Sequence, residues 1–378
     1  MELSALQYAV QACEMIMHTY TPQQVPPVGA FWYHHGVFFS GMEQVYDMTG
    51  DKRYYDYIRE FADSAMGPNG EMYGICHEVV LENRDVDRNS LYTMDAKQCT
   101  IILYRLYDET GDVKYMNAIK SLSESMYYYP TNTYGGYWHK ITTPHQMWLD
   151  GAFMAGPLSV KYAKRFGEPT LRERAIKQIF LMDDYLKDPV TGLYYHGWDP
   201  TKEAEWADPE TGCSPQFWGR AIGWYAVAIL DILDEIPEDH PAVERLKQIE
   251  ADLLKSLATY QDPETGMWFQ VIDRPGAEGN WIESSCTHLF TYSYAKAIRK
   301  GIISREEYGE VVEKAYAGSI GRLYYDEEGY LVIDRICIGT NINEGTYEYY
   351  INRPRQDNHM IGVGAFVRMC VEMEKYRG

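Results

Sequence analysis

The stretch Val45-Tyr-Asp-Met-Thr-Gly-Asp-Lys-Arg-Tyr-Tyr55 decides the fold, because the chain returns to the same pattern. It comes back as Leu106-Tyr-Asp-Glu-Thr-Gly-Asp-Val-Lys-Tyr115 and, more loosely, as Tyr162-Ala-Lys-Arg-Phe-Gly-Glu-Pro169. In each copy one apolar-periodic segment ends at a glycine and a second begins within a few residues, which is typical of a helical hairpin with a glycine C-cap. The repeat therefore predicts successive pairs of helices.

Two further stretches, residues 232–241 and 297–307, make a similar turn with different residues. The predicted turns then fall near positions 50, 111, 167, 237 and 301, and a helical segment from Gly362 to Arg377 would close a last pair with the N-terminal helix. We therefore predict an all-α protein, an (α/α)6 barrel of six hairpins, as a single domain over residues 1–378. In such a toroid the loops before the inner helices meet at one mouth.

A second repeat lies between the hairpins. Lys187-Asp-Pro-Val-Thr-Gly-Leu-Tyr-Tyr195 and Gln261-Asp-Pro-Glu-Thr-Gly-Met-Trp-Phe269 are near copies. Asp-Pro-x-x-Gly is a turn sequence, and the alternating aromatic residues after it indicate short extended segments. We expect short aromatic β-ribbons in the loops at the mouth of the barrel.

Composition excludes some classes of partner. The formal net charge of −20 over 378 residues would repel nucleic acid and anionic membranes. No basic and apolar leader begins the chain and no run of about 18 apolar residues occurs, so we expect a cytoplasmic protein without a membrane partner.

Seven cysteines without a Cys-x-x-Cys pair are typical of reduced, buried thiols. An anionic substrate would need local cations against this acidic background.

Asp150 is the first candidate for chemistry. It stands in His145-Gln-Met-Trp-Leu-Asp-Gly151, directly before a predicted helix. One interpretation is a helix N-cap. The other is a catalytic acid whose pKa is raised by the apolar cover of Trp148. Asp95 holds the comparable place one hairpin earlier, and it is either another cap or the second carboxylate of a sugar pocket.

Other motifs combine aromatic rings with imidazole or guanidinium groups, as sugar-binding pockets do. They are Gly135-Gly-Tyr-Trp-His139-Lys140, Tyr194-Tyr-His196-Gly-Trp198-Asp199 and Trp218-Gly-Arg220-Ala-Ile-Gly-Trp224. Arg220 could hold a substrate carboxylate through two hydrogen bonds, and the structural alternative is a salt bridge at a helix start. His196 has a purely structural alternative as a loop histidine. His34, His35 and His359 are candidates for the rim.

Motifs for cofactors are missing from the sequence. We find no His-Glu-x-x-His pair, calcium loop, phosphate loop, dinucleotide fingerprint or Gly-x-Ser-x-Gly elbow. We expect neither a metal nor an organic cofactor.

Taken in order along the chain, these motifs resemble glycoside hydrolase family 105, the unsaturated rhamnogalacturonyl hydrolases, with the unsaturated glucuronyl hydrolases of family 88 as close relatives. The resemblance covers nearly the whole chain and implies an (α/α)6 barrel. It implies that Asp150 is the general acid/base. The residues implied to shape or flank the subsite for the unsaturated sugar are Asp95, His139, Trp148, His196, Trp218, Arg220 and Trp224. One departure is that Ala221-Ile222 replace the Gly-Asn more common in the family.

The resemblance also implies the reaction. Such enzymes hydrate the C4=C5 bond of a 4,5-unsaturated uronic acid at the non-reducing end of a lyase product and need no cofactor. Unsaturated galacturonyl-rhamnose is the expected substrate, with glycosaminoglycan or other uronide fragments as the alternative. Rivals from other classes are a sugar 2-epimerase, which needs a pair of histidine bases, and a carbohydrate-binding protein without turnover. A monomer or small homo-oligomer is expected.

Overall fold

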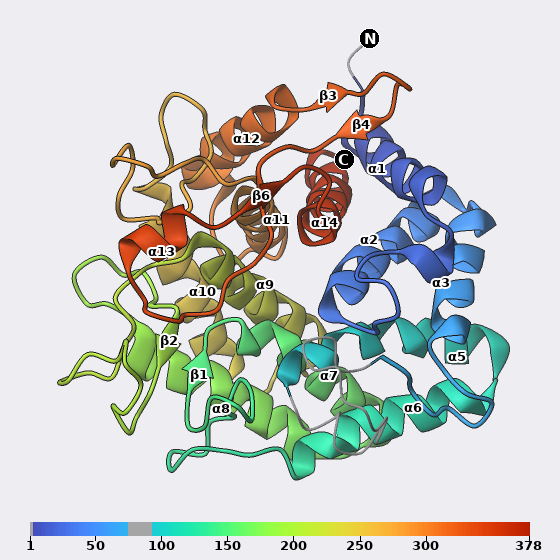
Figure 1. Ribbon diagram of the computed structural model, residues 1–378, viewed down its shortest axis with the longest axis horizontal. Helices are drawn as coiled ribbons and strands as arrows, with labels where there is room; N and C mark the ends of the chain where they lie inside the picture. The colour runs from blue at the N-terminus through green and yellow to red at the C-terminus, as the bar shows by residue number, and fades with distance from the viewer. Residues whose placement is uncertain (1–2, 75–92) are drawn as a thin grey trace.

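The computed structural model describes residues 3–74 and 93–378, and its helices form a ring of antiparallel pairs (Figure 1). The inner helices are α2 (Tyr33–Thr49), α5 (Leu103–Thr110), α7 (Gly151–Phe166), α9 (Gly219–Glu235), α11 (Ser284–Arg299) and α14 (Met360–Arg377). Their outer partners are α3 (Lys52–Ser64), α6 (Val113–Glu124), α8 (Pro169–Leu186), α10 (Val243–Ala258), α12 (Arg305–Gly321) and, for α14, α1 (Ala5–Thr19).

The inner ring closes on itself. Helix α14 packs against α2, and both α2 and α7 pack against the 3-10 turn η3 (Gln98–Ile102) that leads into α5. Helix α7 contacts α9, α9 contacts α11, and α11 returns to α14. Figure 1 shows the last helix, α14, lying beside the first, α1. The predicted (α/α)6 barrel is confirmed.

The hairpin turns lie where the repeat predicts them. Gly50, Gly111 and Gly167 end α2, α5 and α7 with φ of 70°, 67° and 69°. This left-handed conformation is one that glycine adopts without a steric penalty, and it stops the helix. Each of these turns follows the C-terminal end of an inner helix. The N-terminal ends of the inner helices therefore gather at the opposite end of the barrel.

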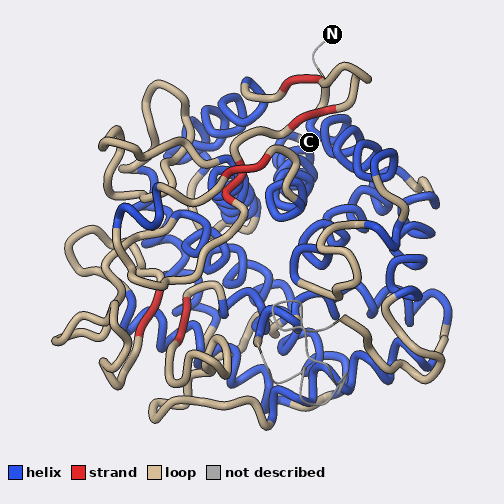
Figure 2. Tube along the Cα trace, viewed as in Figure 1, coloured by secondary structure: helices blue, strands red, loops and turns tan. Residues whose placement is uncertain are grey.

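The loops carry short antiparallel ribbons, as predicted (Figure 2). These are β1 (Met147–Trp148) with β2 (Gly197–Trp198), β3 (Tyr324–Tyr325) with β4 (Leu331–Val332), and β5 (Ile336–Cys337) with β6 (Arg355–Gln356). The near-copy turns make the same bonds: Asp188 and Asp262 accept from the backbone N–H of Thr191 and Thr265 at 2.8 and 2.9 Å. The structure also reveals a third copy that the sequence analysis missed, residues 208–212, in which Asp208 accepts from the Thr211 N–H at 2.7 Å.

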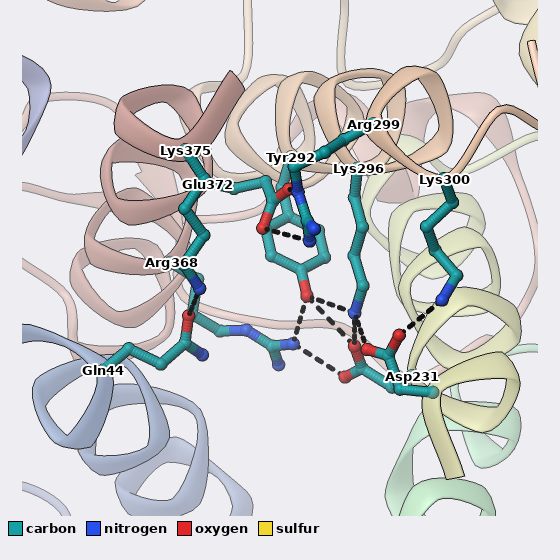
Figure 3. Close-up of polar contacts among 10 residues, drawn as sticks. Gln44, Asp231, Tyr292, Lys296, Arg299, Lys300, Arg368, Glu372 and Lys375 are labelled. Carbon is teal, nitrogen blue, oxygen red and sulfur yellow. Dashed lines mark hydrogen bonds and ion pairs between the residues drawn. The ribbon is translucent and has the colours of Figure 1, made fainter. Parts of the chain in front are cut away.

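Charged side chains join three of the inner helices. Asp231 of α9 lies between Lys296 of α11 and Arg368 of α14, with 2.7 Å to each cation (Figure 3). The Tyr292 hydroxyl donates to the same carboxylate at 3.0 Å. The position of Lys296 in the last turn of α11 is also favourable, because a helix C-terminus carries partial negative charge. The barrel is thus fastened at the end away from the mouth.

The inner helices are buried against both the outer helices and one another. At one crossing α14 approaches α2 so closely that a Cβ added to Gly364 would lie 2.7 Å from the backbone nitrogen of Phe38. Over residues 3–74 and 93–378, the structure contains no helix with the combined length and apolar character that a bilayer crossing needs.

Candidate functional site

A cavity of about 420 Å³ opens at the mouth where the inner helices begin. Residues from the starts of α2, α7 and α14 line it, together with the loops before α9 and after β5. Among the lining residues are Trp32, Tyr33, His34, Asp95, His139, Lys140, Trp148, Asp150, Met154, Trp218, Gly339, Asn341, Arg353 and His359. Its volume lies within the usual range for small-molecule sites.

The ribbon of β1 and β2 brings Asp150 and His196 together. Trp148 pairs with Gly197 across the ribbon, and the N–H of Leu149 donates to the carbonyl of His196 at 2.8 Å. The chain then turns into α7, with Asp150 at the N-cap position. Its side chain makes no capping hydrogen bond. Instead Asp150 Oδ2 lies 3.0 Å from His196 Nε2.

His196 is fully buried and engaged on both ring nitrogens. Its Nδ1 lies 2.6 Å from the hydroxyl of Tyr350, in the short helix α13 (Tyr347–Ile351). In the neutral imidazole that donates from Nε2 to Asp150, Nδ1 accepts from the Tyr350 hydroxyl; in the protonated imidazolium, which brings a positive charge to Asp150, Nδ1 donates to that hydroxyl instead. No sequence motif pointed to Tyr350, which lies 154 residues beyond His196.

The electrostatic environment of Asp150 differs from the expectation. Burial raises the pKa of Asp150, but the charge and hydrogen bond of His196, followed by the charge of His139, lower it by more, so the net pKa is lowered. Apolar cover alone would have raised it. The histidine contact, which the sequence did not reveal, reverses the direction.

Asp95 and His139 form a second acid and imidazole pair on the same wall. The N–H of Met94 donates to the carbonyl of His139 at 3.1 Å, which aligns the two segments. Asp95 Oδ1 lies 3.3 Å from His139 Nε2. The His139 ring stacks on Trp148 with centroids 4.6 Å apart and an interplanar angle of 14°. The sequence-predicted residues Asp95, His139, Trp148 and Asp150 therefore line one cavity.

Arg220 lies behind the cavity wall rather than on its surface. It is 1% exposed, its guanidinium lies 4.8 Å from the Trp218 ring, and it donates to the Cys337 carbonyl. Its Nη2 has no hydrogen-bond partner among the described residues, and a Cβ on the lining residue Gly339 would be 3.5 Å from it. Burial and the Arg220 charge together lower the pKa of His359, a lining residue, to about 4. The Arg220 charge therefore acts inside the cavity.

Two candidates lie elsewhere. Trp224 stacks on Phe153 within the core, at 4.6 Å and 18°, and is not among the residues that line the cavity. His35 is a fully buried residue of α2, and its Nε2 contacts the Val25 carbonyl at 3.1 Å. His34 and His359 do line the cavity, with ring centroids 5.4 Å apart. Ala221 and Ile222 are buried in α9.

Segment 338–360 supplies a side of the cavity of which the sequence indicated only His359. Ile338, Gly339, Thr340, Asn341, Arg353, Gln356, Asn358 and Met360 belong to it. It carries no recognisable motif and reaches the mouth only because the ring closes. Within the described part of the chain, no three or more His, Cys, Asp and Glu side chains are grouped so as to hold a metal ion.

Comparison with known proteins gives consistent similarities. The model for glycosyl hydrolase family 88 matches residues 8–377. A solved glycoside hydrolase from family 105 of C. acetobutylicum ATCC 824 has 31% identity and a TM-score of 0.89, covering 97% of this chain and 99% of that one. The unsaturated rhamnogalacturonyl hydrolase YesR of Bacillus subtilis (strain 168) is 24% identical over 322 residues, which are 83% of this chain and 81% of YesR.

A more distant structure shares the fold alone. The unsaturated glucuronyl hydrolase from Streptococcus agalactiae superimposes with a TM-score of 0.71 at 12% identity, covering 98% of this chain and 91% of its own.

Proposed function

This chain belongs to glycoside hydrolase family 105, within the group that the family 88 model describes, and from that membership we propose that it removes a 4,5-unsaturated uronic acid from the non-reducing end of lyase-generated oligosaccharides. The preferred substrate in this proposal is unsaturated galacturonyl-rhamnose. The observation that carries it is Asp150, held by His196 at 3.0 Å in the wall of a cavity of about 420 Å³.

In the proposed reaction Asp150 is both acid and base. Protonated Asp150 gives its proton to C4, water adds its oxygen to C5, and the resulting carboxylate takes the proton that the water loses. The hemiketal at C5 opens to a ketone, and the hemiacetal left at C1 expels the next sugar as an alcohol. Asp150 ends the cycle protonated, so atoms and charge balance.

The lowered pKa of Asp150 makes substrate binding part of this proposal. Without substrate the carboxylate form is favoured. A substrate carboxylate placed beside Asp150, with water excluded, disfavours that charge and raises the pKa of Asp150. Substrate binding would thus favour protonation of Asp150, the group that then gives its proton to the substrate, while His196 orients the Asp150 carboxyl.

Recognition of the uronate carboxylate is proposed to rest on cations around Gly339. His196 is occupied by Asp150 and Tyr350. Arg220 lies on one side of Gly339, and on the other Arg353 lines the cavity and donates its Nε–H to the Gly339 carbonyl at 2.8 Å. We therefore favour Arg220, acting with Arg353, over His196 as the electrostatic anchor.

The remaining site candidates receive proposed roles from where they lie. Asp95, His139, Trp148 and Trp218 would shape the subsite directly, because all four line the cavity. Trp224 would support the subsite indirectly, by packing on Phe153. The Phe153 ring belongs to α7, and α7 begins directly after Asp150.

The test is loss of the ultraviolet absorbance of the C4=C5 bond on incubation with unsaturated galacturonyl-rhamnose. Asp150→Asn keeps the shape but cannot cycle a proton, so we expect kcat to fall by about 10²- to 10⁴-fold. Asp56→Asn is the matched control: the Asp56 side chain is exposed on the outer helix α3, so turnover should be unchanged. Unchanged turnover in Asp150→Asn would falsify the assignment.

Substrate choice is tested separately. If the enzyme turns over unsaturated glucuronyl disaccharides from glycosaminoglycans faster than unsaturated galacturonyl-rhamnose, those disaccharides become the preferred substrate and the proposed chemistry is unchanged. Isomerisation of a free reducing sugar without bond cleavage would indicate an epimerase instead.

A further inference from the structure

Glu283 is a fully buried carboxylate that takes no direct part in the proposed reaction. It is the N-cap residue of α11, and its Oε2 accepts from the backbone N–H of Cys286 at 2.6 Å. Its Oε1 accepts from the backbone N–H of Cys337 in β5 at 3.0 Å. The hydroxyl of Ser285 donates to both carboxylate oxygens, at 2.9 and 2.8 Å. Glu283 therefore joins the start of α11 to the strand that leads into segment 338–360.

Arg220 shares two of these partners with Glu283. Its Nη1 donates to the Ser285 hydroxyl at 3.4 Å and to the backbone carbonyl of Cys337. The Ser285 oxygen can accept from the guanidinium while its proton goes to the carboxylate. Likewise the N–H of Cys337 donates to Glu283 and its C=O accepts from Arg220. Two bridges of the same polarity thus connect the cation to the anion.

Glu283 and Arg220 are buried charges of opposite sign. The hydrogen bonds that each makes within the described part of the chain go to uncharged groups. A buried charge without a counter-charge is unfavourable. Burial lowers the pKa of Arg220, but neighbouring groups, led by Cys337 and Glu283, raise it by more. Glu283 thus stabilises the charged guanidinium through the two bridges rather than by direct contact.

The indirect pairing leaves part of the guanidinium for a ligand. A direct pair with two hydrogen bonds to a carboxylate would occupy two of its nitrogens. Here Nη1 is fixed by Ser285 and Cys337, and the Trp218 ring lies 4.8 Å from the guanidinium. Nη2 has no hydrogen-bond partner among residues 3–74 and 93–378, and it lies directly behind Gly339, a lining residue without a side chain. One side of Arg220 is therefore held by the protein, and the other is next to the cavity.

We propose that Glu283 is a positioning residue, which acts through Ser285 and Cys337 to keep Nη2 of Arg220 toward the cavity, where it attracts the carboxylate of the unsaturated uronic acid. The inference rests on the proposed function, in which Arg220 is the electrostatic anchor of that carboxylate. Asp150 is another carboxylate whose charge acts on Arg220. Without the charge of Glu283, the guanidinium would be drawn toward Asp150 and lose its position relative to the substrate.

The experiment measures KM and kcat on unsaturated galacturonyl-rhamnose from the loss of absorbance of the C4=C5 bond. Glu283→Gln keeps the size of the side chain and one oxygen acceptor but removes the charge. We expect KM to rise about tenfold, the scale of one charge-assisted hydrogen bond, with a much smaller change in kcat. Ser285→Ala removes one bridge and leaves the carboxylate, so it should raise KM by a smaller factor.

Glu250→Gln is the matched control. Glu250 is likewise a fully buried glutamate, but it lies on the outer helix α10 and is not among the residues that line the cavity. Burial raises the pKa of Glu250 well above its ordinary value, which favours the neutral acid, so an amide there changes the charge little. KM and kcat of this variant should equal those of wild type. Thermal unfolding of every variant checks that the fold is retained.

A double-mutant cycle separates positioning from a general structural role. Arg220→Met alone should raise KM, because the anchor is removed. Adding Glu283→Gln to Arg220→Met should raise KM no further, because Glu283 then has no guanidinium to hold. If Glu283 only supported β5 and segment 338–360, its effect would add to that of Arg220→Met.

The outcomes separate the two proposals. If wild type does not consume the disaccharide, the proposed function fails and the positioning role fails with it. If wild type does consume it, a KM in Glu283→Gln that is equal to or below the wild-type value overturns the positioning role alone. Additive increases of KM in the double variant do the same. If Glu283→Gln does not fold, Ser285→Ala takes its place in the cycle and is judged by the same outcomes.

Discussion

At the scale of single residues, the site depends on which group holds Asp150. A buried carboxylate without a partner would bind a proton more tightly than in water. His196 reverses this through its charge and its 3.0 Å contact, and Tyr350 holds the imidazole from the other side at 2.6 Å. The net lowering of its pKa favours the carboxylate form of Asp150.

Replacing His196 should move the titration of Asp150 upward. In His196→Gln the positive charge is gone and the raising effect of burial is less opposed, so the pKa of Asp150 rises. His196→Ala, which also loses the hydrogen bond, should raise this pKa further. Carbon-13 NMR of labelled aspartate carboxyls, with Asp150→Asn for assignment, measures it. A titration identical to wild type in both variants would show that His196 does not control Asp150.

At the scale of elements, the repeated turns show how local chemistry sets local structure. The three copies of Asp-Pro-x-Thr-Gly make the same bond from the threonine N–H to the aspartate, at 2.8, 2.7 and 2.9 Å. Helix contacts are different, because they require partners from distant parts of the chain. The approach of α14 to α2 at Gly364 is one of these.

Gly364→Ala should destabilise the barrel. The added methyl group would lie 2.7 Å from the Phe38 backbone nitrogen, so the two helices must separate, at a cost of about 1–3 kcal/mol in the free energy of unfolding. Gly321→Ala is the control: it also lies in a helix, and its Cβ would meet nothing within 4 Å. That control should be neutral or stabilise by up to about 1 kcal/mol. Denaturant unfolding compares the pair, and equal midpoints would contradict the packing argument.

At the scale of the whole molecule, Asp231 joins α9, α11 and α14 at the end opposite the mouth (Figure 3). Burial raises the pKa of Asp231, but Arg368 and Lys296 lower it far more, so the net pKa is well below its ordinary value. A depressed folded-state pKa means that the stabilisation is present above the unfolded pKa of about 3.9 and is lost as pH falls toward the folded value.

Asp231→Asn should therefore lower the free energy of unfolding by about 3–5 kcal/mol at neutral pH, because the buried Arg368 loses its counter-ion and the buried Lys296 keeps only its pair with Asp234. The difference from wild type should narrow as pH falls below about 4, where wild-type Asp231 begins to take up a proton. Asp56→Asn removes an exposed pair with Lys52 and should cost less than about 1 kcal/mol. Urea unfolding across pH measures all three proteins, and a pH-independent difference would argue against the ion-pair explanation.

The sequence by itself determined the ring and most of one cavity wall. Glycine C-caps at 50, 111 and 167 and apolar periodicity are local signals, so the hairpins could be read directly, and Asp95, His139, Trp148 and Asp150 followed from their loops. Only the tertiary structure decided that Tyr350 supports His196, that Arg220 lies behind Gly339, and that Trp224 packs in the core. These depend on contacts between residues far apart in the chain, made when the ring closes, and such contacts also set the direction of the Asp150 pKa.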